Sequence, residues 1–277
     1  MANLAKQFSL EGTVVVITGG AGLLGVQHAN AVIAAGGTPV LLDIDLSRLK
    51  VVTDSIRQEY SQSVSGFVCD VTSLSDIERS LRDILVEYSR VDALVNNAAN
   101  DPKVVQGSGV QNGNRFENIS LEAWNKDIGV GLTGAFLCSQ VFGTYMSRHG
   151  GGAIVNIASD LSIISPDQRL YSADDEPEEK RNVKPVTYSV VKTGLIGLTR
   201  YLSTYWADKN VRVNAISPGG IYNEQGEEFV RKIARRIPLG RMAEKHEVQG
   251  ALVYLLSDAS SYVTGINLVV DGGRSVW

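Results

Sequence analysis

The segment Val14-Val15-Val16-Ile17-Thr18-Gly19-Gly20-Ala21-Gly22-Leu23-Leu24-Gly25 decides the fold of this chain. Four consecutive apolar residues predict a buried strand, and the apolar pattern from Leu23 to about Ala35 predicts a helix. Between them, Gly20, Gly22 and Gly25 form a Gly-x-Gly-x-x-Gly arrangement. Glycines let the backbone approach a pyrophosphate closely, and a helix N-terminus offers unpaired N–H groups to its charge. The segment therefore predicts the phosphate-binding turn of a dinucleotide site.

The same alternation of short apolar runs with longer amphipathic ones continues along all 277 residues. Strands that are apolar on both faces and joined by helices indicate a parallel sheet buried between helices. No linker rich in Pro, Gly or Ser divides the sequence, so we expect a single α/β domain over 1–277 with a Rossmann-type doubly wound parallel sheet. The later strands are expected at Val40–Leu42, Gly66–Val68, Ala93–Val95, Ala153–Ile157, Arg212–Ile216 and Asn267–Val270.

Composition excludes several classes of function. A net charge of -4 gives no sign of nucleic acid or an anionic membrane as a partner. Lys6 and Glu11 precede any sustained apolar run, which argues against a signal peptide, and no stretch of about 20 apolar residues suggests a membrane span. We therefore expect a cytoplasmic protein.

Cysteine and histidine usage gives no metal site. Cys69 ends an expected strand and Cys138 lies in an expected helix, so both are predicted to be buried thiols. The three histidines, at 28, 149 and 246, are scattered without the spacing of metal ligands.

Asp43 lies at the end of the second expected strand, about 20 residues after the glycine turn. A carboxylate there can accept hydrogen bonds from the adenosine ribose hydroxyls and would repel a 2′-phosphate. The sequence therefore favours NAD over NADP. Asp45 is the alternative residue that could face the ribose.

Tyr188 and Lys192 lie four residues apart in an expected helix and so share one of its faces. A free phenol loses its proton near pH ~10, but a fixed cation beside it lowers the pKa. This arrangement makes Tyr188 a candidate acid or base near neutral pH. Taken alone, the pair also fits the solvated face of an ordinary helix.

Further motifs in the same order along the chain extend this pattern nearly to the C-terminus, and together they resemble the short-chain dehydrogenases/reductases. The matching stretches are Thr18 to Gly25, Cys69-Asp70-Val71, Asn96-Asn97-Ala98-Ala99, Val155-Asn156-Ile157-Ala158-Ser159, Tyr188-x-x-x-Lys192, Asn214-Ala215-Ile216-Ser217-Pro218-Gly219 and Val269-Val270-Asp271-Gly272-Gly273.

The resemblance implies a role for each matched residue. Tyr188 would exchange a proton with the substrate oxygen, and Lys192 would lower the pKa of the tyrosine and bind the nicotinamide ribose. Ser159 would hydrogen-bond the substrate oxygen and stabilise the charge that develops on it. Cofactor-binding roles fall on Gly19, Gly22, Leu24, Gly25, Asp43, Asp70, Val71, Asn97, Ala98, Tyr188, Lys192, Pro218, Gly219 and Ile221.

The chain departs from the family pattern at three positions. Leu23 replaces a usual glycine in the turn, and Asn223 replaces a threonine that usually follows Pro-Gly. Gly131 stands where the family usually has the asparagine that holds a water linking Lys192 to solvent. Either a water or another side chain completes the proton path, or turnover is slow, or the site binds NAD without reducing anything.

Two polar insertions, near 100–118 and 171–184, lie beside the expected site, and the second separates Ser159 from Tyr188 by more residues than is usual in the family. They are either solvated loops or a polar rim over the substrate. Such a rim suits a sugar or nucleotide sugar better than an apolar molecule, and the loops give a weaker resemblance to bacterial surface-sugar and flagellin-modification oxidoreductases. The basic residues of 222–241 suggest a phosphate or carboxylate on the ligand, or else a solvated helix face.

The sequence thus predicts an NAD(H)-dependent oxidoreductase that interconverts a secondary alcohol and a ketone on a hydroxyl-rich small molecule. The alternative, motivated by Gly131, is a catalytically silent NAD-binding regulator. The resemblance also implies a homodimer or homotetramer joined by the Tyr188 helix, although its small and apolar positions from Gly194 to Leu202 could equally be buried within one subunit.

Overall fold

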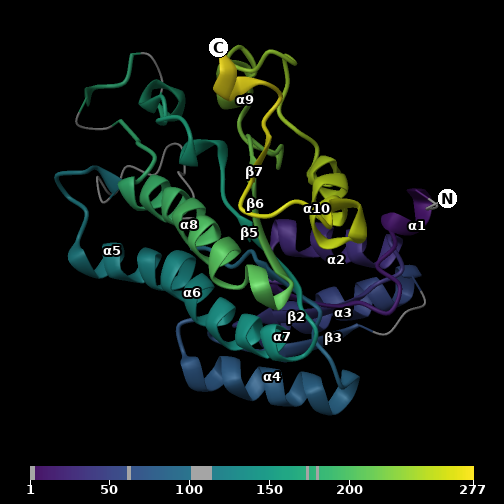
Figure 1. The fold of residues 1–277 in the computed structure, drawn as a ribbon. Helices are drawn as coiled ribbons and strands as arrows, with labels where there is room; N and C mark the ends of the chain where they lie inside the picture. Colours follow the sequence, from purple (N-terminus) through teal and green to yellow (C-terminus); the bar gives the residue numbers. More distant parts are fainter. Residues whose placement is uncertain (1–3, 61–63, 101–113, 173–174, 179–180) are drawn as a thin grey trace.

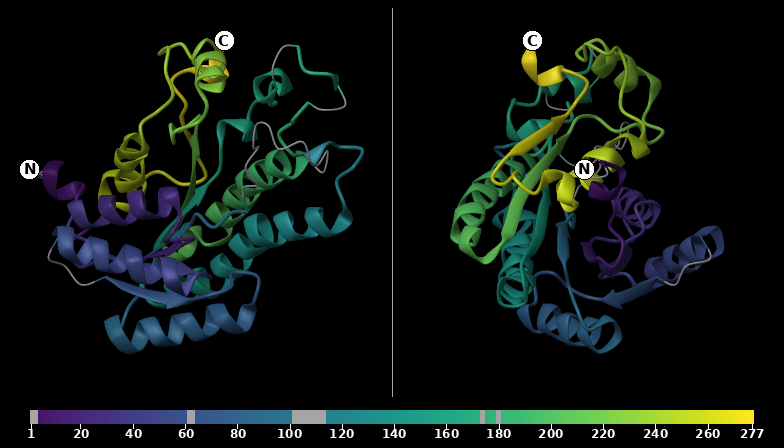
Figure 2. Two further views of the ribbon diagram at one scale, coloured as in Figure 1. Left: turned by 180° about the vertical axis from the view of Figure 1, so that it is seen from behind. Right: turned by 45° about the vertical axis from the view of Figure 1, so that its right-hand side comes forward.

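The computed structural model describes residues 4–60, 64–100, 114–172, 175–178 and 181–277. Its centre is one parallel sheet in the order β3-β2-β1-β4-β5-β6-β7, with helices on both faces (Figures 1 and 2), which confirms the predicted α/β fold. Each predicted strand is present, several of them longer by one or two residues at an end. The strands are β1 (Val14–Thr18), β2 (Thr38–Asp43), β3 (Ser65–Val68), β4 (Ala93–Asn96), β5 (Gly152–Ile157), β6 (Val211–Pro218) and β7 (Asn267–Val270).

The two faces of the sheet carry different helices because alternate residues of each strand point to opposite sides. Val15 and Ile17 of β1 pack with α2, α3 and α10. Val14 and Val16 pack instead with α4, the long helix made of α5 to α7, and α8. The helices are α1 (Leu4–Gln7), α2 (Leu23–Ala34), α3 (Leu46–Tyr60), α4 (Leu74–Tyr88), α5 (Leu121–Ile128), α6 (Gly134–Cys138), α7 (Thr144–Arg148), α8 (Val186–Tyr205), α9 (Glu227–Ala234) and α10 (Gln249–Leu256).

Helix starts follow the expected capping chemistry. The Ser73 hydroxyl accepts a hydrogen bond from the Asp76 backbone N–H at the start of α4, and Ser120 accepts one from Ala123 at the start of α5. These side chains satisfy N–H groups that have no partner within the helix.

Helices α5, α6 and α7 form one continuous rod, Leu121–Arg148, joined by π-helical turns at Gly129–Thr133 and Ser139–Gly143. By length and composition the rod could cross a membrane, a possibility that the sequence analysis discounted. Its side chains Cys138, Phe142 and Met146 are fully buried in the core beneath the sheet. The rod is therefore a core helix. The prediction that Cys69 and Cys138 are buried thiols is confirmed.

Neighbouring strands β1 and β4 mark the point where the chain changes direction across the sheet, since β2 and β3 lie on one side and β5 to β7 on the other. Open α/β sheets bind ligands in the crevice at such a point, outside the carboxyl ends of the strands. The segments predicted to carry the site all follow strand ends at this edge.

Candidate active site

In the turn after β1, Gly19 and Gly25 lie where a side chain would have no room. Gly19 adopts φ +61°, and a Cβ there would lie 2.9 Å from the Cα of Ala98. A Cβ on Gly25 would lie 2.3 Å from the carbonyl oxygen of Gly19. Gly22 begins α2 without a side-chain cap, so the first N–H groups of this 12-residue helix remain available to a phosphate. The turn therefore fits the pyrophosphate of a dinucleotide.

Leu23 and Leu24 have different surroundings. Leu23 is 40% exposed, so the residue that replaces the usual glycine stays out of the packing beneath the turn. Leu24 packs its side chain against the core, which leaves only its backbone for a cofactor.

Thr18 and Asn97 hold the turn in place. The Thr18 hydroxyl accepts hydrogen bonds from the backbone N–H groups of Asn97 and Ala98, both at 3.0 Å. The Asn97 amide in turn donates to the carbonyl oxygens of Thr18 and Gly19. The side chain of Asn97 therefore holds the glycine turn in place, whereas the sequence predicted that Asn97 would contact the cofactor. Thr18 was not predicted as a site residue.

Asp43 and Asp45 are distinguished by their partners. The Asp43 carboxylate accepts hydrogen bonds from the Ala21 N–H at 3.0 Å and from the Asp45 N–H at 3.1 Å, so it lies against the glycine turn. Asp45 accepts from the backbone of Ser47 and Arg48 at the start of α3. Asp45 is therefore occupied as a helix cap, and Asp43 is the carboxylate that lies against the glycine turn. The Arg48 guanidinium also reaches the turn, donating to the Ala21 carbonyl oxygen at 3.2 Å.

The remaining predicted cofactor residues follow the ends of β3 and β6. Asp70 turns the chain after β3 by accepting from the Thr72 N–H and hydroxyl, and Val71 is buried beside Gly134. Pro218 ends β6. Backbone contacts position the residues that follow: the Gly219 N–H donates to the Val270 carbonyl oxygen, and Ile221 forms a β-bridge with Ala243.

Lys192 connects α8 to the end of β5. Its ammonium is buried and donates a 2.7 Å hydrogen bond to the carbonyl oxygen of Ile157. The same ammonium lies 5.7 Å from the ring centroid of Tyr188. The expected pairing of lysine and tyrosine on one face of α8 is therefore present, next to the strand that leads to Ser159.

Lys184 brings a second positive charge to this tyrosine. Its ammonium lies 3.7 Å from the centre of the Tyr188 ring, within the range of a cation–π interaction. Sequence reasoning placed Lys184 in a polar insertion and missed this contact. Lys184 lies just before α8, and Tyr188 lies in the first turn of this helix. Their spacing of four residues in the sequence was the signal that could have predicted the contact.

Ser159 is buried immediately after β5 and belongs to a chain of polar contacts. Its hydroxyl donates to the Asp160 carboxylate at 2.9 Å and accepts from the Leu161 N–H at 3.2 Å. The other carboxylate oxygen of Asp160 accepts a 2.6 Å hydrogen bond from Arg274, close to the C-terminus. The serine hydroxyl must turn from Asp160 to donate to a substrate oxygen, since it has a single proton to give.

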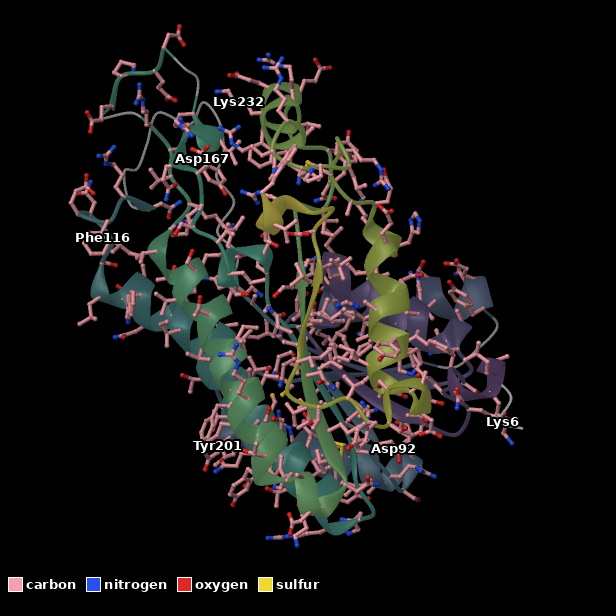
Figure 3. All side chains as sticks on the ribbon, turned by 45° about the horizontal axis from the view of Figure 1, so that its top comes forward. Lys6, Asp92, Phe116, Asp167, Tyr201 and Lys232 are labelled. Carbon is pink, nitrogen blue, oxygen red and sulfur yellow. The ribbon has the colours of Figure 1, made fainter. Side chains whose placement is uncertain are left out.

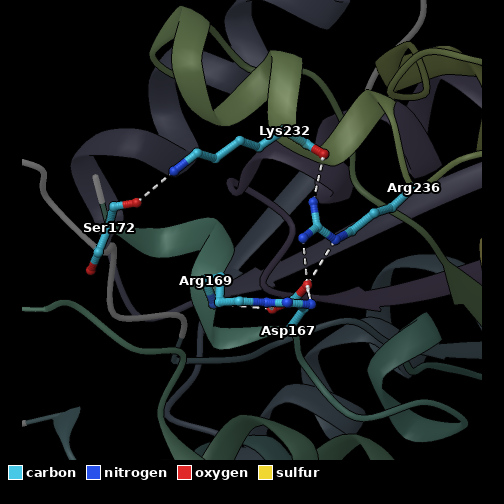
Figure 4. A network of polar contacts seen from close by, with 5 residues as sticks. All are labelled: Asp167, Arg169, Ser172, Lys232 and Arg236. Atoms are coloured by element: carbon cyan, nitrogen blue, oxygen red, sulfur yellow. Dashed lines mark hydrogen bonds and ion pairs between the residues drawn. The ribbon is translucent and has the colours of Figure 1, made fainter. Parts of the chain in front are cut away.

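Lys232 of α9 contacts the second insertion, and Arg236, just after the end of α9, contacts the segment that precedes this insertion. The Arg236 guanidinium pairs with Asp167, which also binds Arg169, and Lys232 donates to the Ser172 carbonyl at 2.8 Å (Figure 4). Hydrogen bonds from Arg169 and Arg236 lower the pKa of the Asp167 carboxyl far below its usual value. Lys232 and Arg236 therefore contact neighbouring segments of the chain. The sequence had suggested either that these residues bind a phosphate or carboxylate of the ligand or that they lie on a solvated helix face.

The described parts of the two insertions contact each other, because Arg115 donates to the Glu178 carbonyl oxygen at 2.7 Å. Residues 101–113, 173–174 and 179–180 of these insertions lie outside the described residues. A cavity of about 550 Å³ opens between 114–117, 161–168 and the start of α8. Its α8 lining includes Ser189 and Thr193, each one residue beyond Tyr188 and Lys192 and so about 100° around the helix. The lining also includes Lys184, the residue that contacts the Tyr188 ring.

Comparison with known proteins identifies the family of this chain. Residues 13–174 match the family described as short chain dehydrogenase, and residues 178–275 match one described as enoyl-(acyl carrier protein) reductase. The chain belongs to the short-chain dehydrogenase/reductase family. A short-chain type dehydrogenase/reductase from Mycobacterium marinum superimposes with a TM-score of 0.85 at 27% identity, covering 100% of both chains.

Relatives of known activity point in more than one direction on the cofactor. An NAD-dependent glycerol dehydrogenase of Listeria innocua is 32% identical, covering 98% of this chain and 97% of the relative. An NADP-dependent mannitol dehydrogenase of Hypocrea jecorina is also 32% identical, over 98% of this chain and 95% of the relative. The post-translational flagellin modification protein A of Campylobacter coli is 26% identical, over 95% and 98%, in keeping with the weaker resemblance noted from the loops.

Proposed function

We propose that this protein is an NAD(H)-dependent oxidoreductase that interconverts a secondary alcohol and a ketone on a sugar or another polyhydroxylated molecule. The observation that carries the proposal is the position of Lys192. Its ammonium is fixed to the Ile157 carbonyl, beside the Tyr188 ring and two residues before Ser159. A module that only bound a dinucleotide would not need a buried cation next to a phenol.

The chain's own residues account for the proton chemistry. When bound, the nicotinamide would accept a hydride from the alcohol carbon or return one to the ketone. Ser159 would hold the substrate oxygen by a hydrogen bond, and Tyr188 would take the hydroxyl proton during oxidation and give it back during reduction. The positive charges of Lys192 and Lys184 would stabilise the phenolate that forms.

The residues that would hold the cofactor line the carboxyl edge of the sheet. The glycine turn and the uncapped start of α2 would bind the pyrophosphate. Asp43 would bind the adenosine ribose, and its charge supports NAD over NADP. Arg48 is the one described cation that contacts the same turn, and it would be the residue to accommodate a 2′-phosphate if Asp43 were removed.

The substrate class rests on two supports. Relatives at about one-third identity are named as dehydrogenases of glycerol and mannitol, which are polyhydroxylated alcohols. The segments after β5 and before α8 are rich in polar and charged groups, such as Asp167, Gln168 and Arg169. A hydroxyl-rich molecule with several donors and acceptors suits this edge better than a long apolar chain. A cytoplasmic location is part of the same proposal.

We further propose that the protein forms a homodimer or homotetramer through α8. The small and apolar positions of this helix divide into two faces. A Cβ on Gly194 would lie 2.8 Å from Leu132 within the subunit, whereas a Cβ on Gly197 would have no neighbour within 4 Å among the described residues. On the Gly197 side, Tyr201, labelled in Figure 3, stacks on Tyr205, and these residues are 64% and 60% exposed. Light scattering on the wild type and on Tyr201→Lys would test this, since a monomeric wild type contradicts it.

A screen of polyols, sugars and nucleotide sugars, following NADH absorbance, tests the enzymatic function. The expected result is turnover of at least one such substrate, with the rate falling on the order of 10²-fold or more in Tyr188→Phe and NAD binding unchanged. Firm NAD binding without turnover of any substrate would favour the silent regulator that Gly131 suggests. Equal turnover in wild type and Tyr188→Phe would remove the tyrosine from the chemistry.

A further inference from the structure

Gly131 leaves no space for the asparagine that the family usually carries there. A Cβ at this position would lie 2.6 Å from Cγ1 of Val191 on α8, a distance that real Cβ atoms do not show. Gly131 is buried inside the π-helical turn Gly129–Thr133. The side chain of Val191 therefore fills the place where a longer residue at 131 would begin.

A carboxylate lies one turn earlier on the same rod. Asp127 is 8% exposed, and its two oxygens accept hydrogen bonds from the Asn100 amide at 2.6 Å and from the Thr187 hydroxyl at 2.5 Å. Thr187 directly precedes Tyr188, and Asn100 follows the Asn-Asn-Ala-Ala segment after β4. Asp127 thus joins three segments of the catalytic site.

A small cavity connects this carboxylate to the catalytic pair. Its volume is about 10 Å³, and its lining includes Asp127, Thr187, Tyr188, Lys192 and Gly131. This volume is close to the space that one water requires, and the polar groups around it can provide the two to four hydrogen bonds that a buried water makes.

The charges on either side of the cavity support a functional pairing. Within the described part of the chain, the hydrogen-bond donors to Asp127 are a neutral amide and a neutral hydroxyl. Burial of a carboxylate is costly unless a cation lies nearby. Lys192, itself 6% exposed, lines the same cavity. Two buried residues of opposite charge therefore line one water-sized space.

We propose that Asp127 is the positioning residue that completes the proton path in place of an asparagine at 131. Asp127 and Thr187 hold one water in the cavity, and this water hydrogen-bonds the Lys192 ammonium. In alcohol oxidation the proton that Tyr188 takes up leaves by way of Lys192 and this water to the Asp127 carboxylate, and then to solvent on the Asn100 side, where the chain is partly exposed. In ketone reduction the proton travels the reverse way. This inference rests on the proposed oxidoreductase function.

The kinetic test compares changes at 127 with a restored asparagine at 131. Asp127→Leu is expected to lower kcat by at least about 10-fold, less than the 10²- to 10⁴-fold of a direct acid or base, with the Kd for NADH near that of wild type. Asp127→Asn, which can still hold a water, should recover part of the loss. In the Asp127→Leu background, the double change Gly131→Asn with Val191→Ala should also recover it, because the alanine removes the methyl group that blocks position 131.

Two outcomes would overturn the inference while leaving the proposed function intact. In one, Asp127→Leu turns over substrate as wild type does, although Tyr188→Phe is inactive in the same assay. In the other, kcat stays low in Asp127→Asn and in the variant with asparagine at 131. A crystal structure gives a readout independent of activity: density for a water bonded to both Lys192 and Asp127 supports the path, and a dry cavity contradicts it.

Discussion

Arg274 and Asp160, separated by 114 positions in the sequence, form a buried ion pair with an Nη1–Oδ2 distance of 2.6 Å. Their side chains are 6% and 3% exposed. Because Asp160 also accepts the hydrogen bond from Ser159, the C-terminal segment is connected to the candidate catalytic serine through a single carboxylate. The end of the chain is thereby part of the scaffold of the active site.

Removal of Arg274 leaves a buried carboxylate without its cation. We expect Arg274→Met to lower the free energy of unfolding by about 3–5 kcal/mol, measured by urea denaturation. The double variant Asp160→Asn/Arg274→Met should lose less, since it leaves no uncompensated charge. Arg169→Met is the matched control, because the Arg169 side chain is 81% exposed in its pair with Asp167 and such pairs contribute about 0–1 kcal/mol. A loss in Arg274→Met as small as that of the control would refute the prediction.

The pair between Arg236 and Asp167 joins the turn after α9 to the segment that follows β5, as shown in Figure 4. Beneath it, Leu170 packs with Ile233 and Ile237 in a small apolar cluster. We expect Arg236→Met to weaken this junction by about 1 kcal/mol, because the pair is partly exposed and charged hydrogen bonds contribute 1.5–3 kcal/mol when desolvated.

In kinetic terms, the Arg236→Met variant should raise KM for the substrate roughly five-fold with little change in kcat. The proposed reason is that α9 follows Pro218 and Gly219 at the carboxyl end of β6 and would cover a bound substrate. Arg169→Met removes a cation from the same carboxylate without touching α9, so it should leave KM unchanged. Identical KM values in wild type and Arg236→Met would show that the junction does not control substrate binding.

Asp43 should set the choice between NAD and NADP. Asp43→Ser removes the charge that would repel a 2′-phosphate while Arg48 remains at the turn, so we expect the Kd for NADPH to fall by about 10-fold or more and the Kd for NADH to rise. Asp45→Ser provides the control, because serine can replace the carboxylate as the cap of α3. Fluorescence titration of NADH and NADPH measures both constants. Tighter binding of NADPH than of NADH by the wild type would contradict the assignment.

Local sequence signals predicted most of this fold. Apolar runs such as Val14–Ile17 marked all the strands of the sheet, because a strand buried on both faces needs apolar residues at every position. Ser73 and Ser120 were recognisable as helix caps from the residues that follow them. The glycine turn and the Tyr188-Lys192 spacing located the catalytic edge, since both depend on neighbours within a few residues.

Contacts between distant residues were not predictable in the same way. Asp160 gave no sign that Arg274 would be its partner, and Asp127 reads as an ordinary polar residue of an amphipathic helix. Asp127 acquires its position from the packing of α5 against α8 and from Val191, which closes the space at Gly131. Such relationships depend on the tertiary arrangement, which no local pattern records.

His28 makes the stability of the protein depend on pH. It is buried in α2, and among the described residues neither of its ring nitrogens has a partner at the distance and angle of a hydrogen bond. Burial lowers the pKa of His28 from 6.5 to about 4, and the nearby Asn97 amide offsets only part of this effect.

Below pH 6.5 the unfolded chain therefore binds a proton at His28 that the folded chain does not bind, and the free energy of unfolding decreases as the pH falls. Between pH 7 and pH 4.5 the contribution of this histidine to stability should fall by about 2 kcal/mol. The Glu247 carboxyl, with a pKa lowered to about 2 by its contact with Arg241, loses its contribution only at lower pH. Urea denaturation at pH 7 and 4.5 should show a larger drop for wild type than for His28→Leu, which has no proton to bind, whereas equal drops would place the acid sensitivity elsewhere.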